Sequence, residues 1–344
     1  MNYEYPFEVV KRKIPKHLAQ EDVSLFSKEF VKELPAVSAT GEEFSWVSPS
    51  GQVLKGLTVN PSQFNIRVGV KGLLRSYLKV VLSLLDLRSV KKLDAAYYVT
   101  NSNSKNFFHW FLDVLQKLEF LEQKHRGATE NGVVIIPSDH KADFMEFSLD
   151  AFGFRFYQQD KDQLISIKKL TVLPDLAPTG NYRKEVVLNL RKRLRNHFLR
   201  ELNESYQVKR VYITRKNAKK RKIVNEEDLL PKLGELGFEI IDMDALGFKQ
   251  QIQVMLGAEM LVSLHGAGLT HMLWMKDRGK VLEIRASGDC HNNCYFTLAS
   301  DLELDYHYSL AEKTDATYGT QQADYIIDRK HFEARLEQMV EQIG

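Results

Sequence analysis

The chain has 344 residues, of which 44% are hydrophobic and 27% charged, and this composition excludes a disordered or fibrous protein. A formal net charge of +3 is too small to indicate a nucleic-acid partner, so any anionic ligand has to be inferred from local clusters of charge. Two cysteines, Cys290 and Cys294, are too few for a secreted disulfide scaffold, and residues 1–19 contain no uninterrupted apolar segment like those of signal peptides or membrane spans. We therefore expect a cytoplasmic protein, soluble or held peripherally at the inner face of the cell membrane.

The first half of the chain alternates predicted strands with predicted helices. Prolines and glycines interrupt residues 1–60, which indicates strands and loops at one edge of a sheet. Hydrophobic periodicity and end signals then predict three helices and three strands. The helices are expected at residues 70–87, 106–125 and 143–152, and the strands at residues 95–100, 133–136 and 170–173. This alternation is typical of a mostly parallel sheet with helices on both faces.

The second half repeats this architecture after a break. Proline and glycine in residues 174–181 indicate a linker, and a basic amphipathic helix follows it. Strands are then expected at residues 208–214, 238–241, 260–264 and 281–284, and helices at residues 182–203, 225–237, 246–256 and 323–343. We predict a Rossmann-like domain in residues 1–180, a second one in residues 181–310, and a tail in residues 311–344 whose helix packs back toward the first domain.

Residues 262–271, with the sequence VSLHGAGLTH, join a predicted strand to a predicted helix through two glycines. Glycine tolerates positive φ and lets a ligand approach the backbone closely, and the free N–H groups at the start of a helix favour an anion. A tight strand-to-helix connection without a ligand is the alternative. If the segment binds phosphate, the residues concerned are Ser263, His265, Gly266, Ala267 and Gly268.

Arg215 indicates the same site because it follows the strand predicted at residues 208–214. In an open α/β sheet ligands bind beyond the carboxyl ends of the strands, so Arg215 and His265 are expected along one rim. A guanidinium can bind a diphosphate through two hydrogen bonds, and residues 216–222 add positive charge, with Lys220 as our candidate. The alternative for this basic run is a solvated loop. We expect no binding to nucleic acid, because the run is short and lacks interleaved aromatic residues.

A second cluster lies at residues 106–115, with the sequence NFFHWFLDVL. Asn106 is a candidate helix N-cap, and His109 and Asp113, four residues apart, lie on one helical face. Such a pair can supply a base, because the carboxylate can hold the tautomer of the imidazole or can itself remove a proton. A purely structural His–Asp pair is the alternative.

Two further features have both a functional and a structural interpretation. Cys290, His291 and Cys294 are residue types that bind zinc, but a single cysteine pair at this spacing is better explained as two reduced thiols, and we expect no metal site. Glu283 lies in the strand after the glycine turn. It is a candidate for accepting hydrogen bonds from ribose hydroxyls, or it is simply an ionised residue at a strand end.

In combination these segments resemble glycosyltransferase family 61, which includes bacterial capsular polysaccharide enzymes and eukaryotic xylosyl- and N-acetylglucosaminyltransferases. The segment NFFHWFLDVL is similar to the first signature of that family. VYITR at residues 211–215, NEE at 225–227, GFE at 237–239 and HGAGLT at 265–270 follow in the order of the family. The resemblance covers residues 95–284.

This resemblance implies a GT-B fold, in which two Rossmann-like domains face each other across a cleft. It implies inverting transfer from a nucleotide sugar, expected to be a UDP-sugar, to a glycan or lipid-linked saccharide in surface polysaccharide biosynthesis, without an obligatory metal or other cofactor. The donor diphosphate would rest on Arg215, Ser263, His265 and the amides of residues 266–268. Asp113, or His109 oriented by it, would remove the proton of the acceptor hydroxyl.

The remaining assignments concern the two substrates. We assign nucleoside contacts to Asp242, Leu246 and Glu283, and acceptor contacts to Asn106 and Trp110. A non-catalytic protein that binds a nucleotide sugar or a polysaccharide is the alternative function, because a phosphate site explains binding alone. The acidic and imidazole groups at residues 106–113 favour an enzyme.

Overall fold

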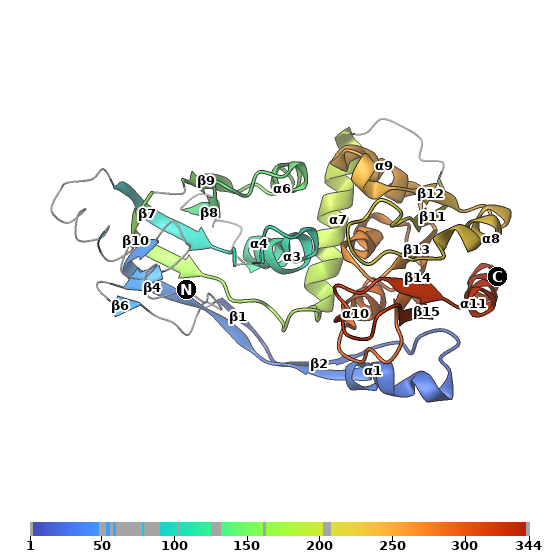
Figure 1. The fold of residues 1–344 in the computed structure, drawn as a ribbon. Coiled ribbons are helices and arrows are strands. Elements are labelled where there is room, and N and C mark those ends of the chain that lie inside the picture. The colour runs from blue at the N-terminus through green and yellow to red at the C-terminus, as the bar shows by residue number, and fades with distance from the viewer. Residues whose placement is uncertain are drawn as a thin grey trace. The chain divides into compact units, whose positions relative to one another are not determined.

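The computed structural model describes residues 3–47, 53–55, 58–59, 78, 90–101, 103–124, 132–160, 163–201 and 208–341. Internal contacts divide the chain into two compact units, whose elements are labelled in Figure 1. The first unit comprises Met1–Phe7 and Pro35–Leu176, and the second comprises Glu8–Leu34 and Ala177–Gly344. The contacts thus assign residues 8–34 to the second unit, whereas we had placed them in a domain spanning residues 1–180.

The first unit is built on a mixed sheet. Its described strands are β1 (Tyr3–Tyr5), β4 (Val37–Val47), β5 (Val53–Lys55), β6 (Thr58–Val59), β7 (Lys91–Tyr98), β8 (Val133–Pro137), β9 (Arg155–Gln159) and β10 (Ile165–Val172). They pair in the order β6-β5-β4-β10-β7-β8-β9, with β1 beside β4. Strands β10, β7, β8 and β9 are mutually parallel, as expected for this half. The antiparallel strands β4, β5 and β6 come from residues 1–60 and lie at one edge, also as expected.

The helices of the first unit carry one of the predicted clusters. They are α3 (Phe107–His109), the π-helical segment η3 (Trp110–Val114), α4 (Leu115–Lys124) and α6 (Asp143–Leu149). The first three run on without a break, so the helix expected at residues 106–125 is confirmed, with a π-helical turn inside it. The helix expected at residues 143–152 is confirmed by α6. The helix expected at residues 70–87 lies outside the described residues, apart from Leu78.

The second unit has a predominantly parallel sheet. Its strands are β11 (Arg210–Ile213), β12 (Glu239–Ile241), β13 (Met260–Leu264), β14 (Lys280–Ala286), β15 (Asp305–Lys313) and β16 (Tyr325–Ile327). They pair in the order β12-β11-β13-β14-β15-β16, and only the pairing of β15 with β16 is antiparallel in the described sheet. Every residue of β13 is buried, which is typical of a parallel strand covered on both faces. The described chain is therefore a mixed α/β protein with parallel strands in both units.

The helices of the second unit follow the predicted alternation with shifted ends. They are α7 (Lys184–Glu201), η4 (Glu226–Asp228), α8 (Leu230–Glu235), η5 (Met243–Ala245), α9 (Phe248–Gly257), η6 (Ala267–Trp274), α10 (Cys294–Asp301) and α11 (Arg329–Glu341). Asn225 makes no capping bond; its side chain instead binds the backbone of Ile327. None of the helices in the described parts of the chain combines the length and the apolar character needed to cross a bilayer.

The N-terminal segment of the second unit packs on β15. It forms β2 (Glu8–Lys11), η1 (Gln20–Asp22), α1 (Val23–Phe30) and β3 (Val31–Leu34), with β2 antiparallel to β3. Phe26 is fully buried, with its ring centroid 5.3 Å from that of Phe296 and 5.2 Å from that of Tyr308. The hydroxyl of Tyr308 donates to Asp22 over 2.7 Å. These long-range contacts bring residues 8–34 to a unit that is remote in sequence.

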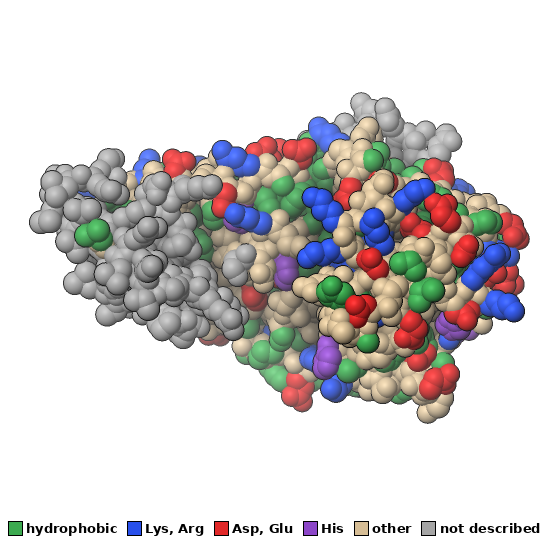
Figure 2. Space-filling view, in the orientation of Figure 1, with side chains coloured by type: hydrophobic (Ala, Val, Ile, Leu, Met, Phe, Trp, Pro, Cys, Tyr) green, Lys and Arg blue, Asp and Glu red, His purple; other side chains and the backbone are tan. Residues whose placement is uncertain are grey.

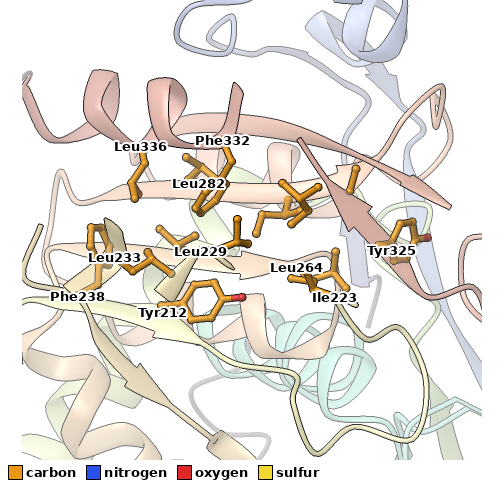
Figure 3. Packing of buried hydrophobic residues seen from close by; sticks show 14 of the residues in the cluster. Tyr212, Ile223, Leu229, Leu233, Phe238, Leu264, Leu282, Tyr325, Phe332 and Leu336 are labelled. Atoms are coloured by element: carbon orange, nitrogen blue, oxygen red, sulfur yellow. The ribbon is translucent and has the colours of Figure 1, made fainter. Parts of the chain in front are cut away.

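The C-terminal helix corrects one expectation. It begins at Arg329 and not at residue 323, because Tyr325–Ile327 pair with β15 as strand β16. Its buried side chains, Phe332, Leu336 and Met339, belong to the hydrophobic core of the second unit (Figure 3). The apolar face of α11 is thus used by the second unit, and the expected packing of this helix toward the first domain stays a prediction.

Truncation of Phe332 is expected to destabilise the second unit. The side chain is fully buried in the cluster that also contains Leu282 and Leu229, so Phe332→Ala should cost about 3–5 kcal/mol of unfolding free energy through lost burial and a cavity. Urea unfolding followed by circular dichroism measures this cost. His331→Ala, at the exposed neighbouring position, should change the free energy by less than about 0.5 kcal/mol, and equal losses for both variants would contradict the packing described for α11.

Candidate active site

The carboxyl rim of the second sheet gathers most of the predicted anion-binding residues. Strands β11 and β13 are parallel neighbours, with Ile213 opposite Ser263, so the segments that follow them leave the sheet at the same edge. Arg215 follows β11 by two residues, and His265 follows β13 directly. The hydroxyl of Ser263 is buried under this turn and donates to the carbonyl of Leu264 over 3.1 Å.

The glycine turn differs from its predicted form in two respects. The segment that follows it is a 3-10 helix, η6, and not the start of an α-helix. Gly266 has φ 167° and ψ 173°, which is extended backbone, so positive φ is not the reason for glycine here. A Cβ at Gly266 would lie 3.4 Å from Nη1 of Arg221, an ordinary contact distance, whereas one at Gly268 would lie 3.3 Å from Cδ1 of Ile213, where packing is tighter. The turn therefore brings the Arg221 guanidinium beside the first residues of η6, and the N–H groups at the start of a helix favour an anion.

Arg221 is the residue that sequence reasoning missed. Its Nη1 donates to the carbonyl of His265 over 3.0 Å and to Oε1 of Gln321 over 3.1 Å. Its backbone adopts φ 57°, a left-handed conformation that is uncommon outside glycine and that recurs at functional sites. The loop is held in place by Lys222, whose backbone N–H donates to Asp324 over 2.8 Å. The basic run was the only sequence signal for this residue, and it did not distinguish Arg221 from its neighbours.

Arg215 braces the loop that carries Arg221. Its Nε donates to the carbonyl of Arg221 and its Nη2 to the carbonyl of Lys220, each over 2.9 Å. Burial and the neighbouring Arg221 guanidinium lower the pKa of Arg215 below its ordinary value. Two guanidinium groups thus lie close enough to repel each other, and an anion between or beside them would relieve that repulsion.

The other predicted donor-side residues lie along the same rim. Lys220 is exposed in the basic loop, and Figure 2 shows Lys and Arg side chains gathered near β11, on the face that the figure presents. Asp242 follows β12, where it accepts from Asn217 over 2.8 Å and caps η5. The carbonyl of Leu246 accepts from Gln251 over 3.0 Å. The rim therefore brings residues from three consecutive parallel strands together.

Glu283 lies under the turn and contacts His265. Its Oε1 is 2.5 Å from Nδ1 of His265, and its Oε2 accepts from the Tyr306 hydroxyl over 2.5 Å. Burial raises the pKa of Glu283, but the hydrogen bond from His265 and the nearby Arg285 outweigh burial and hold the pKa below its ordinary value. Glu283 is fully buried, whereas the His265 side chain is 15% exposed. Glu283 is thus better placed to orient His265 than to bind a ribose.

His109 and Asp113 form the expected pair on the helix that follows strand β7 of the first unit. Nδ1 of His109 lies 2.7 Å from Oδ2 of Asp113. Both residues border or belong to the π-helical segment η3, a rare form that is frequent at functional sites. The His109 side chain is 22% exposed and that of Asp113 6%. The buried Asp113 carboxylate can therefore hold the orientation of the more exposed His109 imidazole.

Asn106 and Trp110 have clear structural roles. The Asn106 side chain accepts from the backbone N–H of Phe108 over 2.9 Å, which confirms the predicted N-cap. Trp110 is fully buried, and its indole N–H donates to Oγ of Ser148 over 2.8 Å. Both side chains thus position the helix that carries His109, and their contact with an acceptor stays a prediction.

A second polar group, not predicted, follows the neighbouring strand β8. Asp139 pairs with Lys105 and accepts from Nδ1 of His140 over 2.9 Å. Burial lowers the pKa of His140 below its ordinary value, against the opposing effect of Asp139. The ring of His140 lies 6.1 Å from that of Trp110, which places the loops after β7 and β8 side by side. No sequence motif indicates this group, because it depends on the pairing of the two strands.

The cysteine segment carries free thiols. Cys290 and Cys294 form no disulfide, and burial raises the pKa of the Cys294 thiol well above its ordinary value. Within the described ranges of the chain, no cluster of three or more His, Cys, Asp or Glu side chains is arranged to hold a metal ion.

Curated relatives of the chain are EGF domain-specific O-linked N-acetylglucosamine transferases. The protein from Bos taurus is 35% identical over 95 residues, which are 26% of this chain and 18% of that protein. The protein from Rattus norvegicus is 33% identical over 113 residues, 30% of this chain and 21% of that protein. The protein from Drosophila melanogaster is 24% identical over 232 residues, 61% of this chain and 42% of that protein. The matched part of the chain thus spans less than half the length of each of these relatives.

The family model of glycosyltransferase 61 matches residues 107–282. These are just over half of the 344 residues, and they run from the helix of His109 and Asp113 to the strand that carries Glu283. The family match thus contains both the His–Asp pair and the rim of the second sheet with Arg215 and His265. The chain belongs to the glycosyltransferase 61 family.

Proposed function

We propose that this chain is an inverting glycosyltransferase that moves a sugar from a UDP-sugar to a saccharide hydroxyl. The observation that carries the proposal is the cationic cluster at the rim of the second sheet. There Arg221 is held against the carbonyl of His265 and beside Gly266, next to the N–H groups that open η6. Preorganised cationic and backbone donors around one point stabilise the charge that develops on a leaving diphosphate.

The donor diphosphate accepts hydrogen bonds from Arg221, His265 and the amides of Ala267 and Gly268 in this proposal. Arg215 contributes positive charge and holds the loop, because two of its N–H groups already bind loop carbonyls. Ser263 and Lys220 are the other residues of the diphosphate site predicted from the sequence, and we expect the exposed Lys220 to contribute less than Arg221. Asp242 and Leu246 remain the proposed nucleoside contacts, and Glu283 becomes a residue that orients His265.

The proposed base is the His109–Asp113 pair of the first unit. His109 is the more exposed member, so an acceptor hydroxyl would reach the imidazole before the carboxylate. Asp113 holds Nδ1, and Nε2 takes the proton as the acceptor oxygen attacks the anomeric carbon and the sugar–phosphate bond breaks. The proposal requires that the two units face each other across a cleft, as in the GT-B fold.

The substrates follow from the family and its relatives. Because the relatives are named as N-acetylglucosamine transferases, UDP-N-acetylglucosamine is the first donor to test. A glycan or lipid-linked saccharide of surface polysaccharide biosynthesis, reached at the cytoplasmic side of the membrane, is the proposed acceptor.

A thermal-shift screen against UDP-, GDP- and CMP-sugars tests the donor class. A ligand that binds only the folded state at 100 times its Kd stabilises that state by about 2.7 kcal/mol. UDP-sugars should raise the melting temperature, and the best of them should release UDP when a saccharide acceptor is added. Failure of every nucleotide sugar to shift the melting temperature would contradict the proposal, and binding without any turnover would favour the non-catalytic alternative.

Removal of divalent metal is expected to leave the transferase active. Arg221, His265 and the helix N–H groups provide the positive charge that a metal would otherwise supply to the leaving diphosphate. UDP release should therefore proceed in EDTA within about twofold of the untreated rate, a change below about 0.5 kcal/mol in activation free energy. Loss of activity in EDTA that manganese restores would show that the donor site is incomplete without a metal.

A further inference from the structure

We propose that Glu283 is a positioning residue that favours the imidazolium form of His265 when the donor diphosphate binds, so that donor binding takes up a proton. The inference rests on the proposed function, because it assumes that the donor diphosphate binds at His265. It adds a role for a buried residue that does not itself contact the donor.

The contacts of Glu283 are all internal. It lies on β14 opposite Ser263 in the parallel register, directly beneath the turn that carries His265. One carboxylate oxygen lies 2.5 Å from Nδ1 of His265, and the other accepts from Tyr306 over 2.5 Å. The side chain has no exposed surface. A carboxylate in such a place is stable only with hydrogen bonds and a positive partner.

The protonation state of the imidazole determines whether its Nε2 donates or accepts a hydrogen bond. A carboxylate only accepts, so Nδ1 of His265 must carry the proton in this contact. In the neutral ring Nε2 would then be a lone-pair acceptor, which cannot bind a phosphate oxygen. In the imidazolium Nε2–H is a donor, and the ring bridges the buried carboxylate and the diphosphate with alternating charge.

Charged and titratable groups on several neighbouring elements interact with the pair, by direct contact or electrostatically. They are Arg285 on β14, Tyr306 on β15, Cys294 and Tyr295 on α10, and Arg221 on the basic loop. The guanidinium groups of Arg285 and Arg221 disfavour a positive charge on the nearby imidazole, whereas the Glu283 carboxylate favours one. A diphosphate offsets both guanidinium groups, so binding favours the imidazolium more strongly than the empty site does. The proton taken up comes from the buffer.

Isothermal titration with UDP between pH 6 and 9 tests the inference. Because UDP binds the protonated site, wild-type affinity should fall as pH rises, by up to about tenfold per pH unit. The binding enthalpy should depend on the ionisation enthalpy of the buffer, as proton uptake requires. In His265→Gln both effects should be lost, apart from the part that titration of UDP itself contributes to every variant.

The Glu283→Gln variant distinguishes an electrostatic effect of Glu283 on His265 from a purely structural role of this side chain. The amide keeps the shape but loses the charge, so UDP affinity should fall about tenfold at pH 7.5 and recover only at lower pH than in the wild type. Tyr306→Phe is the matched control, because it removes the other hydrogen bond to Glu283 and keeps the carboxylate. Its pH profile should follow that of the wild type. Identical profiles for the wild type and Glu283→Gln would overturn the inference.

Histidine NMR measures the protonation of the His265 ring in the wild-type protein, so this test does not depend on the folding of the Glu283 variant. With UDP bound, both ring nitrogens of His265, assigned by their absence in His265→Gln, should be protonated. A neutral ring with a bare Nε2 in the complex would overturn the inference. The proposed function fails in a different way, namely if wild-type protein binds no UDP at any pH, or if His265→Gln and Arg221→Ala bind it as tightly as the wild type.

Discussion

Asp113→Asn is expected to reduce kcat by a factor of roughly 10²–10⁴ while leaving UDP affinity within twofold of the wild type. The carboxylate lies 2.7 Å from Nδ1 of His109 and is 6% exposed, so its loss removes the group that fixes the imidazole tautomer. An asparagine amide can present a donor to Nδ1 and stabilise the wrong tautomer. UDP release with a saturating acceptor measures kcat, and titration calorimetry measures UDP affinity.

Two comparisons assign the base within the pair. Asp150→Asn, an exposed carboxylate of the same unit, should retain the wild-type rate. His109→Gln should lose as much activity as Asp113→Asn if Nε2 takes the proton. Substantial activity in His109→Gln together with none in Asp113→Asn would identify the carboxylate itself as the base. Wild-type turnover in Asp113→Asn would place the base outside this pair.

Arg221→Ala is expected to weaken UDP binding by about 10- to 100-fold, which corresponds to the roughly 1.5–3 kcal/mol of a hydrogen bond to a charged group. The guanidinium is fixed by the His265 carbonyl and Gln321, so it is ordered before the ligand arrives. Titration calorimetry with UDP at constant ionic strength gives the change in Kd.

Lys220→Ala is the matched control because it removes the same charge from the adjacent residue. Lys220 is exposed, so screening by solvent should limit its effect to about threefold. If Lys220→Ala weakens UDP binding more than Arg221→Ala, then the lysine chosen from the sequence is the diphosphate contact and the arrangement of Arg221 is incidental.

The sequence predicted those elements whose residues are all buried or regularly amphipathic. Strand β13 was predicted at its observed ends, since its five residues are all buried and glycines follow directly. Strand β15 was missed because its sequence, DYHYSLAEK, mixes polar and aromatic residues. Its two tyrosines are buried with their hydroxyls donating to Glu283 and Asp22 and their rings packed against Phe26. Partners so distant in sequence leave no periodic pattern.

Contacts of the candidate site could be predicted where both residues lie in one segment of the chain. They could not be predicted where the residues come from different segments. His109 and Asp113 are four residues apart on one helix, so their contact followed from helical geometry. Arg221 depends on a left-handed backbone at one loop residue, and the basic run does not encode which residue adopts it. The link from His265 to Glu283 depends on the parallel register of β13 and β14. Sequence reasoning therefore named both residues but gave Glu283 a different role.

A crystal structure of the protein with UDP tests the central claim most directly. The account predicts a diphosphate within hydrogen-bond distance of the Arg221 guanidinium, Nε2 of His265 and the amides of Ala267 and Gly268, with the uridine along the rim toward Asp242. UDP bound elsewhere, or a diphosphate at this rim held only by lysines of the basic loop, would contradict it.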